Sequence, residues 1–151
     1  MSRAFVRESA ESAAPPERMI AEGPNPVTQA GYEKIAAEVA RLEGALKSEP
    51  NVLLRETLER DLRYWTVKKA SAQVAPPPEG AAIAFGSRVT LIRNGRRQSM
   101  RIVGEDEADP ACGLVSWRSP LAQAVIGAME GDEIEMARPK AEIAIVKVEN
   151  S

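Results

Sequence analysis

Residues 47–52 read KSEPNV, and this short stretch decides how the N-terminal half of the chain folds. Helical patterns precede and follow it. Pro50 cannot continue the first helix, because it lacks the backbone N–H and its ring clashes with the preceding turn. Asn51 is a good N-cap for the second helix. The stretch therefore predicts a turn between two antiparallel helices.

Amphipathic periodicity flanks this turn on both sides. Apolar residues recur every three or four positions, as on one face of an α-helix. The first stripe consists of Ile35, Val39, Leu42 and Leu46. The second consists of Leu54, Leu58, Leu62 and Trp65. With Thr28 as the N-cap of the first helix, residues 24–74 are expected to form a helical hairpin, or short coiled coil, about 30 Å long.

A linker and a change of period follow the hairpin. Residues 75–82 hold three consecutive prolines and predict a stiff, extended segment. Beyond it the apolar period shortens to two, which indicates strands. Asn94 and Gly95 stand between two such runs and are typical of a two-residue β-turn. Further strands are expected at residues 113–117, 132–137 and 141–149, and the last supplies the candidate core residues Ile143, Ile145 and Val148.

One short helix interrupts these strands. It is expected to begin at Ser119 as the N-cap, with Pro120 in its first position, and to close at Gly127. Because strands outnumber helices, residues 83–150 are expected to form a small antiparallel β domain with one short helix. The fold class is therefore α+β. Residues 1–23 lack periodicity and are expected to be a flexible N-terminal segment.

The composition excludes several classes of function. The 151 residues include no His and one Cys, so Ser-His and Cys-His nucleophiles, His or thiolate zinc sites and an internal disulfide are excluded. The net charge of −2 argues against sequence-independent binding of nucleic acid. There is no apolar run of membrane-spanning length and no signal-peptide pattern. We expect a cytoplasmic protein with no cofactor or metal ion of its own.

An acidic loop lies between two of the expected strands. Glu105, Asp106, Glu107 and Asp109 are candidates to gather around a divalent cation, but they lack the spacing and the bidentate closing glutamate of an EF-hand. A solvated acidic loop is the favoured interpretation. Cys112 is expected to be a small, semi-buried residue, because nothing nearby would make its thiolate a nucleophile.

Four arginines bracket the Asn94-Gly95 turn, namely Arg93, Arg96, Arg97 and Arg101. They are candidate contacts to phosphate groups or to an acidic protein surface. Arginines on a sheet edge also protect a protein against aggregation. The sequence leaves both interpretations open.

The hairpin offers two further candidates. Glu49 is the one carboxylate in the turn, and a tip carboxylate can hold a metal ion or orient a water in a partner's active site. A solvated turn residue is the favoured interpretation. Tyr64 and Trp65 can form a binding surface, but packing within the hairpin is favoured.

Taken together, these segments resemble the bacterial transcription elongation factors GreA and GreB. The stretch VTQAGYEKIAAEVARLE is similar to the family's opening helix, LTxxGxxKLxxEL, and SAQV at residues 71–74 is similar to the end of its second helix. FGSRVTL, RIVGEDEAD, SPLAQAVIG and GDEIEM resemble successive segments of its C-terminal domain. The resemblance covers nearly all of residues 26–149.

The resemblance implies an FKBP-like C-terminal domain that docks beside the secondary channel of bacterial RNA polymerase, and a coiled coil that enters the channel. In the family, acidic residues at the tip help to hold the second catalytic Mg²⁺, and the polymerase itself cleaves the RNA. The implied polymerase-binding residues are Arg118, Ser119, Pro120 and Leu121. The chain would then not be an enzyme, its contact with Mg²⁺ would be at most indirect, and it would meet DNA or RNA only within the polymerase complex.

Two departures from the family pattern matter. Arg118 stands where the family often has Asp or Asn, which reverses the charge at a docking position. KSEPNV lacks the family's acidic tip motif D-x-x-E-N-x-E-Y, and both helices are shorter by similar amounts. A short arm also occurs in the related regulator of nucleoside diphosphate kinase, Rnk, although the helix sequences here are more similar to those of GreA and GreB.

We therefore expect a polymerase-binding regulator that modulates elongation or competes with other channel-binding factors, without strong stimulation of cleavage. One alternative is a true cleavage-stimulating factor, in which Glu49, Glu56 or Asp61 assists the metal. Another is a binding module for a protein other than polymerase, which would use the four arginines and Arg118.

Overall fold

A computed structural model of the chain describes residues 15–150, whose elements fall into two units. Residues 1–14, most of the expected N-terminal segment, lie outside the described part, as does residue 151. The first unit contains Ile35–Ser71 and the described residues before Pro24. The second contains Pro24–Lys34 and the described residues from Ala72 onward. No helix in this described part is both long and apolar enough to cross a membrane.

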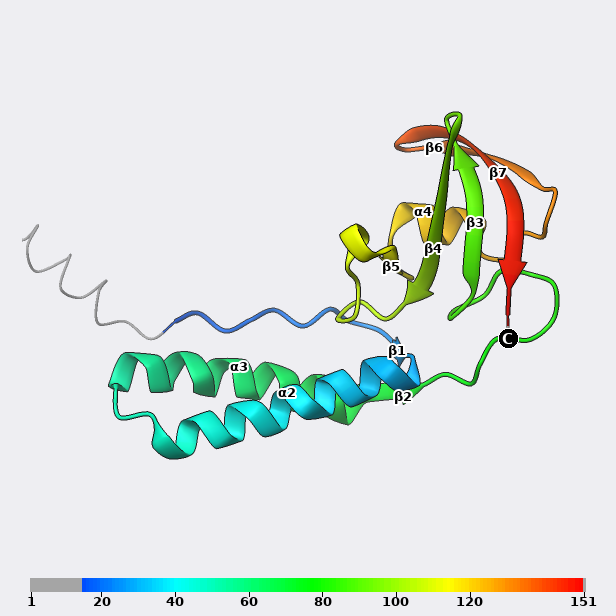
Figure 1. The fold of residues 1–151 in the computed structure, drawn as a ribbon. Coiled ribbons are helices and arrows are strands. Elements are labelled where there is room, and N and C mark those ends of the chain that lie inside the picture. The colour runs from blue at the N-terminus through cyan, green and yellow to red at the C-terminus, as the bar shows by residue number, and fades with distance from the viewer. Residues whose placement is uncertain (1–14, 151) are drawn as a thin grey trace, which may run out of the picture. The chain divides into compact units, whose positions relative to one another are not determined.

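The first unit is built on an antiparallel helical hairpin (Figure 1). Its helices, α2 (Gln29–Ser48) and α3 (Val52–Ser71), have 20 residues each. Both begin with the expected cap. Thr28 Oγ1 accepts a hydrogen bond from the N–H of Gly31 at 2.9 Å, and Asn51 Oδ1 accepts one from the N–H of Leu54 at 3.1 Å. These side chains satisfy N–H groups that lack a partner within the first helical turn.

The apolar stripe of α2 is confirmed, since all of it is buried except the half-buried Leu46. The expected stripe of α3 is confirmed only in part. Leu54 is 53% exposed, whereas Lys68, which has no place in an apolar stripe, is 1% exposed. Leu54 is exposed because the first turn of α3, beside the chain reversal, has little of α2 to pack against.

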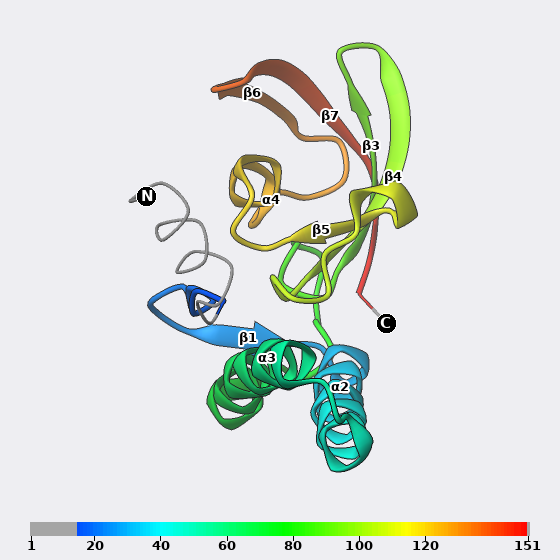
Figure 2. The ribbon, with the colours of Figure 1, turned by 90° about the vertical axis from the view of Figure 1, so that its left-hand side faces the viewer.

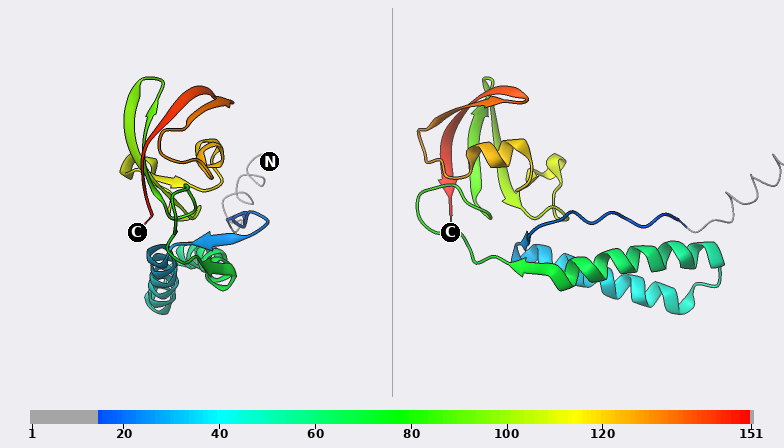
Figure 3. Two further views of the ribbon diagram at one scale, coloured as in Figure 1. Left: turned by 90° about the vertical axis from the view of Figure 1, so that its right-hand side faces the viewer. Right: turned by 180° about the vertical axis from the view of Figure 1, so that it is seen from behind.

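The second unit contains a five-stranded sheet in the order β5-β4-β3-β7-β6, which curls around α4 (Pro120–Val125), as Figure 2 and the left view of Figure 3 show. The strands are β3 (Arg88–Arg93), β4 (Arg96–Val103), β5 (Leu114–Ser116), β6 (Glu133–Ala137) and β7 (Lys140–Glu149). A short 3-10 helix, η1 (Pro110–Cys112), precedes β5. The expected fold class, a helical hairpin followed by a small β domain, is confirmed.

The local signals in this unit are also confirmed. Asn94 and Gly95 have positive φ angles of 49° and 82°, as both central residues of a type I′ turn require. Ile143 and Ile145 are buried, and Val148 packs against the core as a partly buried residue. The apolar faces of the sheet and of α4 meet in this one core.

Two features of the sheets differ from expectation. β4 pairs with β5 in parallel, with Arg101 opposite Leu114, whereas the other pairs of the five-stranded sheet are antiparallel. A parallel pair needs a crossover connection, and residues 104–113 provide it. In addition, β1 (Asn25–Val27) and β2 (Ala72–Val74) form a separate two-stranded parallel sheet. Both lie within the range expected to be helical, residues 24–74, and three-residue strands leave too short a pattern to detect.

Candidate functional site

An open cavity of about 580 Å³ lies beside the start of α4. Ser119 Oγ accepts a hydrogen bond from the N–H of Ala122 at 3.2 Å, and Pro120 follows in the first helical position. This cap fixes the orientation of the first turn of α4. Leu121 is buried toward the core, whereas Pro120 is exposed at the cavity rim. The cavity, called the docking groove below, is lined by Arg93, Gln98, Ser99, Met100, Pro110, Ala111, Gly113, Val115, Ser119, Pro120, Leu121, Met136 and Pro139.

The strand register divides the four arginines between two faces of the sheet. Arg93 and Arg96 are paired across β3 and β4. Because side chains alternate along a strand, Arg93 lies on the same face as the buried Leu91, and it lines the docking groove. Arg97 and Arg101 lie on the opposite face, where Arg101 Nε donates to the carbonyl of Gly86 at 3.3 Å. The groove thus combines an apolar lining with one guanidinium, which suits an apolar side chain next to a carboxylate.

Arg118 is occupied within its own unit rather than in the groove. Its Nε lies 3.0 Å from Glu105 Oε2, and its Nη2 donates to the carbonyl of Pro24 at 3.2 Å. The guanidinium also lies 4.8 Å from the centroid of the Trp117 ring. The side chain is 33% exposed. Arg118 therefore ties the acidic loop to the segment that leads into β1.

The acidic loop is anchored rather than solvated. Glu105, Asp106 and Glu107 are half-buried, and Glu107 Oε2 accepts a hydrogen bond from Thr28 Oγ1 at 2.7 Å. The expectation of a solvated loop holds for the exposed Asp109 but not for Glu105 and Glu107. Arg118 pairs with Glu105, and Thr28, which bonds Glu107, is 79 positions away in the sequence. Within residues 15–150, no group of three or more His, Cys, Asp or Glu side chains is placed to hold a metal ion.

Cys112 is exposed, not semi-buried as expected, because η1 carries it outward before the left-handed Gly113 (φ 75°) turns the chain into β5. A hydrogen bond to Asp109, and the negative charge of that carboxylate, raise the pKa of the Cys112 thiol. The thiol therefore stays protonated at neutral pH and is a weak nucleophile.

The hairpin tip, residues 49–54, uses its one carboxylate to hold the turn. Glu49 Oε1 accepts a hydrogen bond from the N–H of Asn51 at 3.0 Å. Arg55 Nη1 donates to the carbonyls of Leu46 and Glu49, at 2.6 and 3.1 Å. The three residues that follow Asn51 are apolar and exposed: Val52 by 67%, Leu53 by 53% and Leu54 by 53%.

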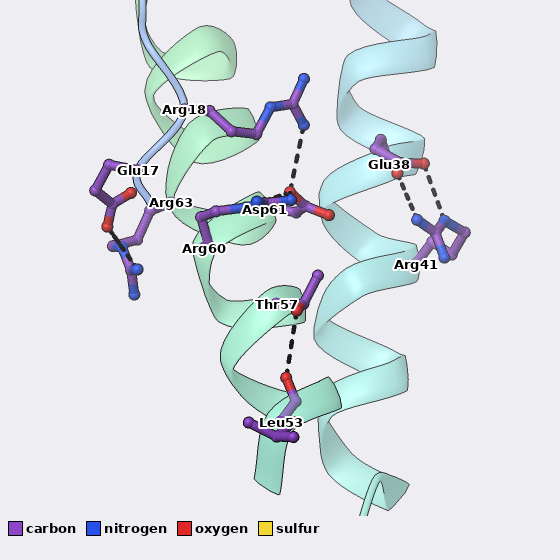
Figure 4. Close-up of polar contacts among 9 residues, drawn as sticks. All are labelled: Glu17, Arg18, Glu38, Arg41, Leu53, Thr57, Arg60, Asp61 and Arg63. Carbon is purple, nitrogen blue, oxygen red and sulfur yellow. Dashed lines mark hydrogen bonds and ion pairs between the residues drawn. The ribbon is translucent and has the colours of Figure 1, made fainter. Parts of the chain in front are cut away.

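The other two candidate carboxylates of the hairpin do not join Glu49. Asp61 lies about 14 Å along α3 from its first residue, at the helical rise of about 1.5 Å per residue. It is paired with Arg60 at 2.9 Å and with Arg18 at 3.5 Å (Figure 4). One oxygen of Glu56 is buried and accepts no hydrogen bond from the described residues. The three carboxylates therefore have separate surroundings.

Comparison with known proteins identifies the family. The model of the GreA/GreB transcription elongation factor C-terminal domain matches residues 78–150. GreA of Nitratiruptor is 37% identical to this chain over 148 aligned positions, which cover 78% of this chain and 87% of that protein. This chain belongs to the GreA/GreB family. GreB of Neisseria meningitidis is 41% identical over 98 positions, covering 61% of this chain, and the chain spans 60% of the length of that relative.

Two solved structures are more distant from this Gre-family chain. A GreA factor homologue of Thermus thermophilus is 22% identical, with a TM-score of 0.41. The match covers 84% of this chain and 99% of that one. A GreA/GreB factor of Nitrosomonas europaea is 20% identical, with a TM-score of 0.39, and covers 84% of this chain and 98% of its own.

The structure of this Gre-family chain brings together part of the predicted site. Ser119, Pro120 and Leu121 meet Arg93 at the docking groove, whereas Arg118, Arg96, Arg97 and Arg101 are not part of it. Met136 and Pro139 line the groove and were missed by the sequence reasoning. The alternation in DEIEM marks Met136 as inward-facing, but no local signal places Pro139 beside α4.

Proposed function

We propose that this Gre-family chain is a regulator that binds bacterial RNA polymerase, docking through the groove beside Pro120 at the secondary channel while the helical hairpin occupies the channel entrance. It modulates elongation or competes with other channel-binding factors. It is not itself a catalyst and carries no metal ion. Membership of the family supports polymerase as the partner, and the docking groove supplies a surface for it.

The hairpin tip carries the finer part of this proposal. A carboxylate that assists a catalytic Mg²⁺ must present free oxygen ligands at the end of the arm. Glu49 directs its carboxylate to the N–H of Asn51 instead, and apolar side chains follow it. Productive geometry tolerates errors of only about an ångström, and Asp61 lies about 14 Å further back on α3. The arm is therefore suited to filling a channel and poorly suited to completing a metal site.

A cleavage experiment on backtracked RNA polymerase complexes tests the proposal. We expect the chain alone to leave the RNA length unchanged over the time in which a long-armed GreA factor shortens it. Added in excess before that factor, the chain should suppress the shortening, because both occupy one channel. Rapid shortening by this chain alone would favour a true cleavage factor. Failure both to shorten and to suppress, with no binding in a polymerase pull-down, would favour a partner other than polymerase.

The variant Glu49→Ala refines the same experiment. This variant alone should still leave the RNA uncleaved, and its suppression of GreA-stimulated cleavage should stay within about twofold of that by the unmodified chain. The Glu49 carboxylate only holds the turn, and Arg55 still clamps the turn through the carbonyls of Leu46 and Glu49. The measured quantity is the cleavage rate constant with and without the GreA competitor. A cleavage activity that disappears in Glu49→Ala would show that the tip carboxylate works on the metal after all.

A further inference from the structure

Residues 15–23, called the N-terminal strap below, run beside α3 within the first unit (Figures 1 and 4). They contain no helix and no strand. Glu17 Oε1 lies 2.5 Å from a terminal nitrogen of Arg63, and Arg18 Nη1 lies 3.5 Å from Asp61 Oδ1. The N-terminal segment was expected to be flexible throughout, but its described part makes specific contacts with the hairpin.

Arg18 is the anchor of the strap. Its guanidinium lies 3.8 Å from the centroid of the Tyr64 ring and 5.5 Å from that of Trp65. The two rings meet edge to face, with an interplanar angle of 88°, so one ring face of Tyr64 is presented to the cation. Together with the Asp61 carboxylate, the rings form a notch that suits a guanidinium. Tyr64 and Trp65 thus have a contact role beyond the packing expected from the sequence.

Charged side chains near the notch also act on Glu38 of α2. The pKa of the Glu38 carboxyl is lowered, chiefly by the hydrogen bond from Arg41. The neighbouring carboxylate of Asp61 acts in the opposite direction, and the positive charge of Arg18 reinforces the lowering. Arg18 therefore lies near one carboxylate on each helix, in addition to Arg41 and Arg60, which pair with Glu38 and Asp61.

The rest of the strap is more exposed than its anchor. Pro15 and Arg18 are half-buried, while the other strap residues are exposed, Met19 by 93%. The Glu17–Arg63 pair is exposed at both ends, 61% and 58%, and such pairs are weak and screened by salt. The Arg18–Asp61 pair is less exposed than the Glu17–Arg63 pair, so replacing Arg18 should loosen the strap more than replacing Glu17.

We propose that the N-terminal strap is an autoinhibitory latch, in which Arg18 holds the segment against α3 and must release it before the hairpin can enter a partner's channel. This inference rests on the proposed function. An extended segment laid beside a helix widens the arm by about 5–10 Å, the spacing at which extended chains pack against a neighbour. A channel that fits the two helices alone would not admit the widened arm. The latch therefore competes with insertion, and its release raises the population that can bind.

The test has two readouts, and the first concerns the latch alone. In ¹⁵N-labelled full-length protein at low salt, the heteronuclear NOEs of residues 17–22 should approach those of α3. They should fall in Arg18→Ala and in 0.5 M NaCl, and fall less in Arg18→Lys, which keeps the charge. Lys69→Ala is the matched control, because Lys69 is an exposed cation on α3, the helix beside which the strap runs. Strap NOEs equally low in the unmodified protein and in Arg18→Ala would overturn the latch.

The second readout is affinity for RNA polymerase at one fixed salt concentration. Arg18→Ala should bind about three- to tenfold more tightly than the unmodified chain, as expected for the loss of one cation–π contact and one partly exposed ion pair. Lys69→Ala should not. Equal or weaker binding by Arg18→Ala would overturn autoinhibition while leaving the proposed function intact. If neither protein binds polymerase, the proposed function and the competition both fail, and the NOE contrast still decides whether Arg18 holds the strap.

Discussion

Replacing Gly104 with alanine should destabilise the second unit by about 1–3 kcal/mol, the usual effect of forcing a methyl group into a well-packed site. A Cβ at position 104 would lie 2.7 Å from the carbonyl oxygen of Pro26 and 3.4 Å from Val27 Cγ1. The first of these is backbone, so β1 itself must shift. β1 is paired with β2, and the carbonyl of Val27 accepts a hydrogen bond from the N–H of Ala75 at 2.9 Å. The clash therefore disturbs both short strands.

Scanning calorimetry measures this effect, and it resolves two transitions if the two units unfold separately. The transition of the second unit should fall by at least about 5 °C. Gly44→Ala is the matched control, since Gly44 lies near the C-terminal end of α2 and a Cβ there meets nothing within 4 Å. It should stabilise the hairpin by about 0.5–1 kcal/mol. An unchanged transition in Gly104→Ala would contradict the close approach of β1 to residue 104.

Pro120→Glu should weaken binding to RNA polymerase at least about tenfold. Pro120 is exposed at the rim of the docking groove. A carboxylate buried there against a partner would lose its water in a mostly apolar lining, where Arg93 is the one cation among the described residues. A penalty of about 1.4 kcal/mol is a tenfold change in the dissociation constant. The helix itself should survive, because a negative charge is favourable at a helix N-terminus and the Ser119 cap remains.

Met129→Glu is the control for this substitution. It also replaces an exposed apolar side chain with a carboxylate, since the Met129 side chain is 50% exposed. Met129 lies outside the docking groove. Affinity measured by fluorescence anisotropy of labelled protein should fall for Pro120→Glu and stay within about twofold for Met129→Glu. Equal losses in both variants would point to net charge, and no loss in Pro120→Glu would remove the groove from the docking surface.

Arg118 departs from the family pattern and also has partners within the chain. A reversed charge at a docking position suggests a changed partner surface. In the structure the same guanidinium pairs with Glu105, bonds the carbonyl of Pro24 and lies against Trp117. The arginine is thus accounted for by contacts inside the chain, which weakens the case for a separate binding module built on it.

Local signals along the chain determined most of the secondary structure. Thr28, Asn51 and Ser119 act as caps, and Asn94-Gly95 forms the turn, because each acts on backbone groups within four residues of itself. The hairpin and the succession of strands follow from the same short-range periodicity. The family could also be recognised at this level, because it rests on short motifs in a fixed order.

Only the tertiary structure decided which of these residues meet. The parallel pairing of β5, the β1–β2 sheet, the anchoring of the acidic loop by Thr28 and the capture of Arg18 by Tyr64 and Asp61 all join residues more than ten positions apart. Such contacts leave no periodic trace, because they depend on how two faces approach each other rather than on the spacing within one segment. The docking groove arises in the same way, from α4, η1, β4 and β6 packed around a shared core.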